Sequence, residues 1–267
     1  MVDGRKRQSV SVADRGLQYG DGLFETIALS DGEPRRWSLH WQRLESGCLR
    51  LGIVPPEEAR LLADLRALPS PAGKSVAKII VTRGSAGRGY RPPKKSLSSR
   101  IVTLHDWPRY PQSWSDKGVR VRWCDTACGQ NPALAGLKHL NRLEQVLARA
   151  EWDDEDVPEG LMCDLEGRPI SGTMSNLFVV DSGVVKTPSL TACGVEGVMR
   201  RAVMDYCHDN DLHCRVGVLN RADLYQAQEI FLTNALVGIW PVRELGGRAV
   251  DAPGPVTARL QARLSTK

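Results

Sequence analysis

One aperiodic segment divides this chain of 267 residues and limits what it can fold into. Residues 108–116, PRYPQSWSD, interrupt the hydrophobic periodicity with two prolines and several polar side chains. This composition is typical of a linker between domains, and a chain of this length can form two modest domains. We therefore predict an N-terminal domain over residues 1–107, a linker over 108–118 and a C-terminal domain over 119–267.

Both halves contain patterns for strands and for helices. Apolar runs predict strands at 23–29, 76–82, 101–104, 119–123, 160–164, 176–180 and 229–233. Helical spacing, with Ser38 as the cap of the first helix, predicts helices at about 39–51, 55–68, 139–152 and from the glycines near 197 to about 210. Strands mixed with helices in both halves predict an α/β (α+β) fold.

Composition and charge exclude several classes of protein. The 42% of hydrophobic and 25% of charged residues are ordinary for a globular protein. The net charge of +5 is spread along the chain, so it supports nucleic-acid binding only weakly, and an acidic small molecule is an equally good partner. We expect a small anionic partner and no nucleic acid. The N-terminus lacks the apolar core of a signal peptide, and no apolar run approaches the ~20 residues that span a membrane. We therefore expect a cytoplasmic protein without membrane contact.

The seven cysteines indicate buried, reduced thiols rather than a metal site. Their number is odd, and none are paired in the Cys-x-x-Cys spacing of metal and redox motifs. We predict no metal.

The segment 134–145, LAGLKHLNRLEQ, places Lys138 between a small-residue turn and an amphipathic helix. A lysine at such a position can project into a cleft and form a Schiff base if desolvation or a nearby cation keeps its amine partly neutral. The alternative is an ordinary solvated lysine near the start of a helix.

Three further segments have the composition of anion sites. Residues 82–90, TRGSAGRGY, combine glycines with Arg83 and Arg88, although a flexible hairpin with solvated arginines has the same composition. The glycines of 193–200, CGVEGVMR, precede a helix whose free N–H groups would suit a phosphate. The polar turn Asn234-Ala235 follows the last predicted strand and could share the same anion.

Taken together, these motifs resemble the fold-type IV pyridoxal-phosphate enzymes, the family of branched-chain and D-amino-acid aminotransferases. The lysine run and the Arg83–Tyr90 loop are most similar to the aminodeoxychorismate lyases of that family. The matching motifs, in chain order, are Asp14-Arg15-Gly16, Tyr19-Gly20-Asp21-Gly22, His40-x-x-Arg43-Leu44, Arg83-Gly84-x-x-x-Arg88-Gly89-Tyr90, Lys138–Glu144, Asn176-Leu177-Phe178 and Gly197-Val198-Met199-Arg200.

The resemblance implies a two-domain architecture with pyridoxal 5'-phosphate between the domains, in a homodimer. Lys138 would hold the cofactor covalently. Arg43, the backbone of Val198 and Met199, and the Asn234-Ala235 turn would bind its phosphate. Asn176 and Ser171 would also contact the cofactor, and the substrate would face Thr26, Arg88 and Tyr90.

The implied reaction converts 4-amino-4-deoxychorismate, a small anionic amine, into 4-aminobenzoate and pyruvate for folate synthesis. Two positions depart from the family pattern: Ser171 stands where relatives normally have a glutamate, and Ala127 where lyases often have an arginine. The alternatives are a branched-chain or D-amino-acid aminotransferase, a lyase homologue acting on another amine, and a binding protein without catalysis.

Overall fold

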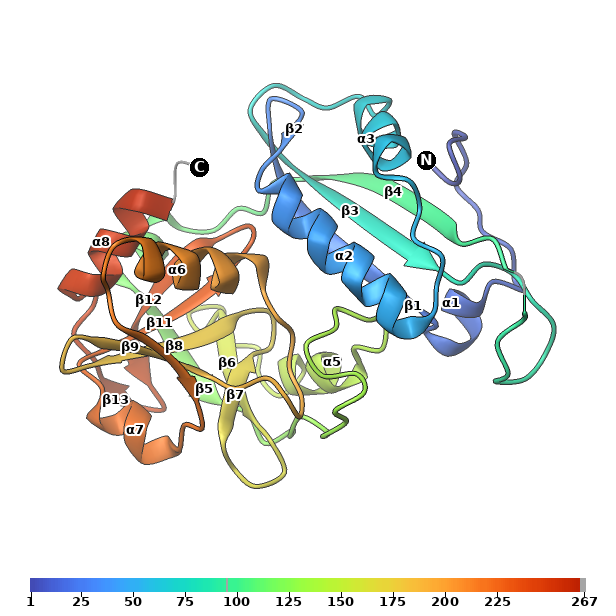
Figure 1. The fold of residues 1–267 in the computed structure, drawn as a ribbon. Helices are drawn as coiled ribbons and strands as arrows, with labels where there is room; N and C mark the ends of the chain where they lie inside the picture. Colours follow the sequence, from blue (N-terminus) through green and yellow to red (C-terminus); the bar gives the residue numbers. More distant parts are fainter. Residues whose placement is uncertain (95, 265–267) are drawn as a thin grey trace. The chain divides into compact units, whose positions relative to one another are not determined.

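A computed structural model describes residues 1–94 and 96–264 (Figure 1). The chain divides into two compact units, the first comprising Met1–Pro108 with Leu137–Asn141 and the second Arg109–Gly136 with Arg142–Lys267. This division differs from the predicted domains because Leu137–Asn141, with Lys138, belongs to the first unit. The predicted linker also contains a helix, α4 (Gln112–Lys117). The last three positions of the predicted second domain lie outside the described residues.

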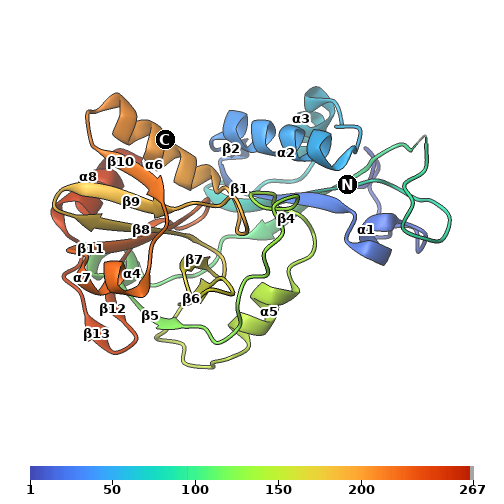
Figure 2. The same cartoon turned by 60° about the horizontal axis from the view of Figure 1, so that its bottom comes forward.

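The first unit is a four-stranded antiparallel sheet with the strand order β2-β1-β3-β4. Helices α2 and α3 lie against one face of this sheet (Figures 1 and 2). The strands are β1 (Gly22–Ser30), β2 (Glu33–Pro34), β3 (Lys74–Thr82) and β4 (Ser99–Asp106), and the helices are α1 (Arg15–Tyr19), α2 (Trp37–Leu51) and α3 (Glu58–Arg66).

Helix α2 packs closely on β1 because a glycine stands at the contact. A Cβ atom at Gly47 would lie 2.8 Å from a methyl carbon of Leu23, so a larger residue would have to displace either Leu23 or the helix. The prediction that Ser38 caps this helix is wrong, since the helix begins at Trp37 after Arg36 in a left-handed conformation. Helix α3 begins three residues later than predicted, because Pro55–Glu57 precede it in extended or irregular form.

The second unit is built on a nine-stranded sheet in which six strands form a closed ring, β8-β11-β12-β5-β6-β7, with β7 pairing back to β8. Strands β9 and β10 extend it from β8, and β13 pairs with β12. The strands are β5 (Val119–Trp123), β6 (Glu159–Cys163), β7 (Pro169–Gly172), β8 (Asn176–Asp181), β9 (Val184–Pro188), β10 (Cys214–Gly217), β11 (Glu229–Asn234), β12 (Gly238–Leu245) and β13 (Arg248–Ala249).

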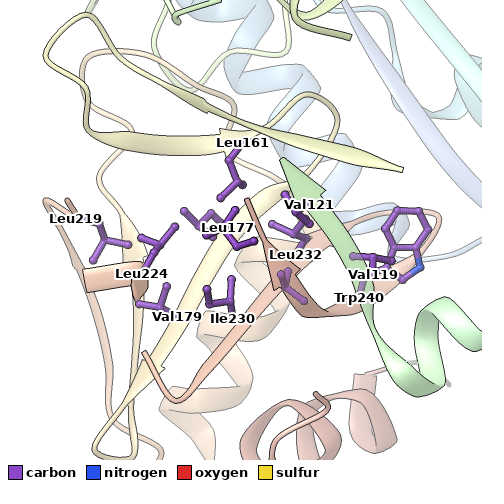
Figure 3. Packing of buried hydrophobic residues seen from close by; sticks show 12 residues of the cluster. Val119, Val121, Leu161, Leu177, Val179, Leu219, Leu224, Ile230, Leu232 and Trp240 are labelled. Atoms are coloured by element: carbon purple, nitrogen blue, oxygen red, sulfur yellow. The ribbon is translucent and has the colours of Figure 1, made fainter. Parts of the chain in front are cut away.

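Alternating residues of the central strands fill two separate cores. Figure 3 shows Leu177 and Val179 of β8 gathered with Leu232 of β11 in the first core. Their neighbours Phe178 and Phe231 stack in the second core, with ring centroids 4.9 Å apart. Because both faces of these strands are covered, their sequences are continuously apolar, as expected for buried strands.

Helices α6 and α8 cover the second core, which includes Met199 and Val203 of α6 and Leu260 of α8. The predicted helix at 139–152 is shorter, because residues 138–140 pair with β1 instead (described below) and the helix begins only at Leu143. The helices of this unit, besides α4, are α5 (Leu143–Arg149), α6 (Val198–Asp209), α7 (Arg221–Gln226) and α8 (Pro255–Leu264).

All seven cysteines are free, and six of them are buried. Within residues 1–94 and 96–264, no helix is both long and apolar enough to cross a membrane.

Candidate active site

Lys138 lies on a short segment that extends the edge of β1. The N–H of Phe24 donates a 2.9 Å hydrogen bond to the carbonyl of Lys138, and the N–H of Leu140 donates to the carbonyl of Gly22 at 3.0 Å. Leu23 and His139 form an antiparallel bridge. This backbone pairing fixes the direction in which the Lys138 side chain points. Lys138 lies opposite Phe24, and directly opposed residues of antiparallel strands share one face of a sheet.

The side chain of Lys138 is half-buried, and its Nζ lies 4.4 Å from the centroid of the Phe24 ring. Thr26, the predicted substrate residue, follows two positions along β1 and therefore shares the face of Phe24. The structure thus brings Thr26 and Lys138 to one face of the sheet, away from the face on which α2 packs.

The opposite face holds Arg43 in a buried ion cluster. Glu25 is 1% exposed and accepts a hydrogen bond from Arg43 Nε at 2.8 Å and another from Arg43 Nη2. The Nδ1 atom of His40 lies 2.6 Å from the same carboxylate. The structure therefore gives Arg43 a definite protein partner and a fixed orientation, and its predicted contact with a phosphate stays a prediction.

The pKa values of Glu25 and His40 are both shifted in this cluster. Burial acts to raise the pKa of Glu25, but the positive charge of Arg43 and the hydrogen bond with His40 outweigh it and lower the pKa to about 2. Burial is the main cause that lowers the pKa of His40, and the positive charges of Arg43 and Lys138 lower it further. The hydrogen bond and the negative charge of Glu25 act to raise this pKa but do not outweigh the other effects. Glu25 is therefore an anion at neutral pH, and the field of Lys138 reaches this cluster.

Arg88 and Tyr90 lie on the exposed loop that follows β3, and Tyr90 is 85% exposed. The buried guanidinium of Arg15 holds this loop by donating to the carbonyls of Gly89 at 2.9 Å and Tyr90 at 3.1 Å. The hydroxyl of Tyr19 accepts a hydrogen bond from the N–H of Gly89. The two N-terminal motifs therefore anchor the arginine-glycine loop.

In the second unit, the predicted residues Ser171, Asn176 and Asn234 lie on neighbouring strands. Ser171 of β7 pairs with Asn176 of β8, and Asn176 also pairs with Thr233 of β11, the residue before Asn234. The sheet thus gathers three of the predicted cofactor residues at one place.

Asn176 also fixes the start of α6, which carries Val198 and Met199. Its Nδ2 donates a 2.8 Å hydrogen bond to the carbonyl of Val195. A Cβ atom at Gly197 would lie 1.9 Å from Asn176 Oδ1, so a larger residue here would have to displace the Asn176 side chain. The helix begins after Gly197 without a side-chain cap, which leaves the first-turn N–H groups directed at any ligand there.

The polar groups around this helix start fit a phosphate. Asn234 uses its Oδ1 to accept from the N–H groups of Leu236 and Val237, both at 2.9 Å, and so forms a tight turn around Ala235. Thr233 is fully buried, yet its Oγ1 has no hydrogen-bond partner among the described residues. An unsatisfied buried hydroxyl beside an uncapped helix start indicates a site for a polar ligand.

Four groups that the structure makes prominent have no role predicted from the sequence. His40 is present only as part of a motif, whereas Glu25, Lys78 and Glu159 give no signal in the sequence. Glu159 of β6 is completely buried. Burial raises the pKa of its carboxyl group, although hydrogen bonds from Thr173 and Ser175 act to lower it. This carboxyl group accepts hydrogen bonds from Thr173, Met174 and Ser175 and so orders the turn between β7 and β8.

Comparison with known proteins identifies the family. The family model for amino-transferase class IV matches residues 22–245. The chain therefore belongs to the class IV aminotransferases, the fold-type IV enzymes, which agrees with its α/β units.

Several full-length relatives are lyases or aminotransferases of this family. The chain is 36% identical to the aminodeoxychorismate lyase of Vibrio harveyi over 99% of both sequences. It is 46% identical to the crystal structure of 4-amino-4-deoxychorismate lyase from Pseudomonas aeruginosa, with a TM-score of 0.93 and coverage of 98% of this chain and 97% of that one. The branched-chain amino acid aminotransferase of Escherichia coli is 26% identical, with a TM-score of 0.82 and coverage of 95% and 88%.

Proposed function

We propose that this protein is a pyridoxal-phosphate-dependent lyase that converts 4-amino-4-deoxychorismate into 4-aminobenzoate and pyruvate, a step in folate synthesis. The observation that carries the proposal is Lys138, presented by the edge of β1 in a chain similar over its full length to two such lyases. The small anionic amine substrate also suits the positive net charge of the chain.

The chemistry would be shared between the cofactor and Lys138. Bound pyridoxal phosphate would supply an electron sink that makes the amine-bearing carbon of the substrate acidic. We propose that Nζ of Lys138 removes the proton from that carbon and then delivers a proton to the enolpyruvyl methylene as the C–O bond breaks. The ring becomes aromatic, and pyruvate leaves without a second substrate.

The remaining predicted residues would hold the cofactor and the substrate. We propose that Arg43, the first N–H groups of α6 and the Asn234-Ala235 turn serve the phosphate. Support comes from the uncapped start of α6 and from the unpartnered hydroxyl of Thr233. Ser171 would hydrogen-bond the ring nitrogen, and Thr26, Arg88 and Tyr90 would contact the substrate.

An aminotransferase is the second candidate, since the family also contains the branched-chain enzymes. Ser171 argues against it. A serine can hydrogen-bond to the ring nitrogen but is not acidic enough to keep it protonated, whereas transamination depends more strongly on that proton than elimination does.

Absorption spectroscopy, borohydride reduction and product analysis test the proposal. The purified holoenzyme should absorb near the visible edge, and borohydride should fix the cofactor on Lys138, as peptide mass spectrometry would show. Lys138→Ala should lose the absorption band and the borohydride-fixed cofactor, whereas Lys117→Ala, on an exposed helical turn, should keep both. Pyruvate released from the aminodeoxychorismate alone supports the lyase. If the protein instead transfers an amino group to an oxo-acid and releases no pyruvate, the lyase proposal is wrong and the protein is an aminotransferase. If the protein is colourless and takes up no cofactor, both enzyme proposals are wrong and only a binding role is left.

We also propose that the chain forms a homodimer through α5. Leu143, Val146 and Leu147 are 76%, 60% and 61% exposed and form an apolar stripe with helical spacing. Such a patch on a short helix is typical of an interface. Val146→Glu should convert the dimer to a monomer in analytical ultracentrifugation, and Leu49→Glu, at an isolated exposed leucine of α2, should not.

The seven free cysteines support a reducing location, and we propose the cytoplasm.

A further inference from the structure

Lys78 occupies the middle of a polar row on the same sheet face as Lys138. In the antiparallel register, Lys78 of β3 lies opposite Thr26 of β1 and opposite Thr103 of β4. Directly opposed residues project to the same face, so two hydroxyl groups flank the lysine. All three side chains are half-buried.

The ring of Phe24 connects Lys78 with Lys138. The Nζ of Lys78 lies 5.3 Å from the ring centroid, and the Nζ of Lys138 lies 4.4 Å from it. Two ammonium groups therefore approach one aromatic ring. Like charges repel, and this arrangement becomes favourable when an anion lies beside them.

Lys78 also differs from the buried and half-buried arginines of its unit. Arg15, Arg83 and Arg100 each form an ion pair with an aspartate. Lys78 forms no ion pair with any of residues 1–94 and 96–264, and its Nζ lies over the Phe24 ring. A half-buried ammonium group that has no carboxylate partner in its own unit is available to an anionic ligand.

We propose that Lys78 binds a carboxylate of the substrate whose amine reacts at Lys138. This inference rests on the proposed lyase function, whose substrate carries two carboxylates. It makes Lys78 a specificity-determining residue, with Thr26 as a flanking hydrogen-bond donor, whereas the hydroxyl of Thr103 is hydrogen-bonded to Nε2 of His105 at 2.8 Å.

Steady-state kinetics of Lys78→Gln, Lys78→Met and Lys78→Arg test the proposal in the holoenzyme. Lys74→Gln is a matched control because Lys74 lies on the same strand, with its Nζ also 5.3 Å from an aromatic ring, that of Trp107, but at an exposed position. Loss of a charge-assisted contact should raise KM by about 10- to 100-fold in Lys78→Gln and Lys78→Met. Lys78→Arg keeps the charge and should lose less, and Lys74→Gln should match the wild type.

Binding of the products supplies a second measurement that does not need turnover. Calorimetry with 4-aminobenzoate and with pyruvate should show weaker binding of at least one of them to Lys78→Gln, with unchanged cofactor absorbance and thermal unfolding. If the wild type releases no pyruvate, the proposed function fails, and the calorimetric comparison still tests Lys78. Equal product affinities in Lys78→Gln and Lys74→Gln, or a loss in kcat with unchanged KM, would overturn the role in substrate binding.

Discussion

Arg43 Nε donates a 2.8 Å hydrogen bond to Oε1 of Glu25, while Nη2 of the same guanidinium donates to the other carboxylate oxygen. Two parallel hydrogen bonds fix the plane of the guanidinium as well as its position. The pair connects α2 to β1, so the helix that carries Arg43 and the strand that supports Lys138 are joined by charge as well as by apolar packing.

Replacing Glu25 by Gln should destabilise the first unit. The pKa of Glu25 falls from 4.5 to about 2, which corresponds to about 3 kcal/mol at ~1.4 kcal/mol for each pH unit. Removing one partner of a buried ion pair costs a similar amount because the other charge stays buried. Urea unfolding should show this loss for Glu25→Gln and almost none for Glu33→Gln, at an exposed position. Equal stabilities of the two variants would contradict the buried pair.

The contribution of Glu25 should also disappear in acid. Its folded pKa lies below its unfolded value, so the stabilisation is present above about pH 4.5 and is lost as the pH falls toward about 2. The difference in unfolding free energy between the wild type and Glu25→Gln should therefore be constant from pH 7 to 5 and shrink below 4.5. A difference that stays constant down to pH 3 would show that Glu25 is not an anion in the folded protein.

Much of the fold follows from local sequence patterns, and the exceptions have physical causes. The strand predicted at 119–123 is confirmed, as is the continuously apolar strand that begins at Asn176. The short strand β2 and the edge strand β10 were missed because they have only two and four residues, without a buried apolar pattern. The helix predicted from His139 starts late because backbone pairing with β1 competes with helical hydrogen bonds.

The candidate site could be predicted only in part, because motifs name residues without their partners. Lys138 was predicted from its turn and from the motif around it. The neighbours of Lys138 on the sheet face were not, since they depend on the register between β1 and β3. The partner of Arg43 lies 18 positions away in sequence, and no periodicity connects Glu25 to it.

Asn176 and Gly197 should behave as a coupled pair. Gly197→Ala should be strongly destabilising because the new Cβ would lie 1.9 Å from Asn176 Oδ1, while the backbone at 197 is extended and tolerates alanine. Asn176→Ala should cost about 1 kcal/mol through the lost hydrogen bond to Val195. In the double variant the clash is absent, so its loss of stability should be smaller than the sum of the single losses. Additive losses in a double-mutant cycle would exclude the contact.

The cysteines should differ sharply in reactivity. Burial raises the pKa of Cys48 to about 12, whereas a hydrogen bond from Cys207 lowers the pKa of Cys214. Cys214 is half-buried, and the other six cysteines are buried. The thiolate is the reactive form, so native protein treated with iodoacetamide at pH 8 should be labelled first at Cys214. Mass spectrometry of tryptic peptides measures this order, and Cys214→Ser should remove the fast phase. Fast labelling of Cys48 would show that α2 opens readily.

Arg15 should control the order of the loop that carries Arg88 and Tyr90. In Arg15→Gln the two hydrogen bonds to the carbonyls of Gly89 and Tyr90 are lost, at a cost of about 1–3 kcal/mol. The fold should survive because Asp21 keeps its pair with Arg83, whose Nε lies 2.8 Å from the carboxylate.

Hydrogen exchange and kinetics together separate loop order from global stability in this variant. Amides of residues 85–90 should exchange faster in Arg15→Gln, whereas those of β1 should keep their protection. If the loop faces the substrate, KM should rise while cofactor binding stays unchanged. Arg60→Gln, which removes an exposed pair with Glu57 on α3, should alter neither. Unchanged exchange in residues 85–90 of Arg15→Gln would show that the other contacts of the loop, such as the hydrogen bonds from Gly89 to Tyr19 and from Ala86 to Ala13, suffice to hold it.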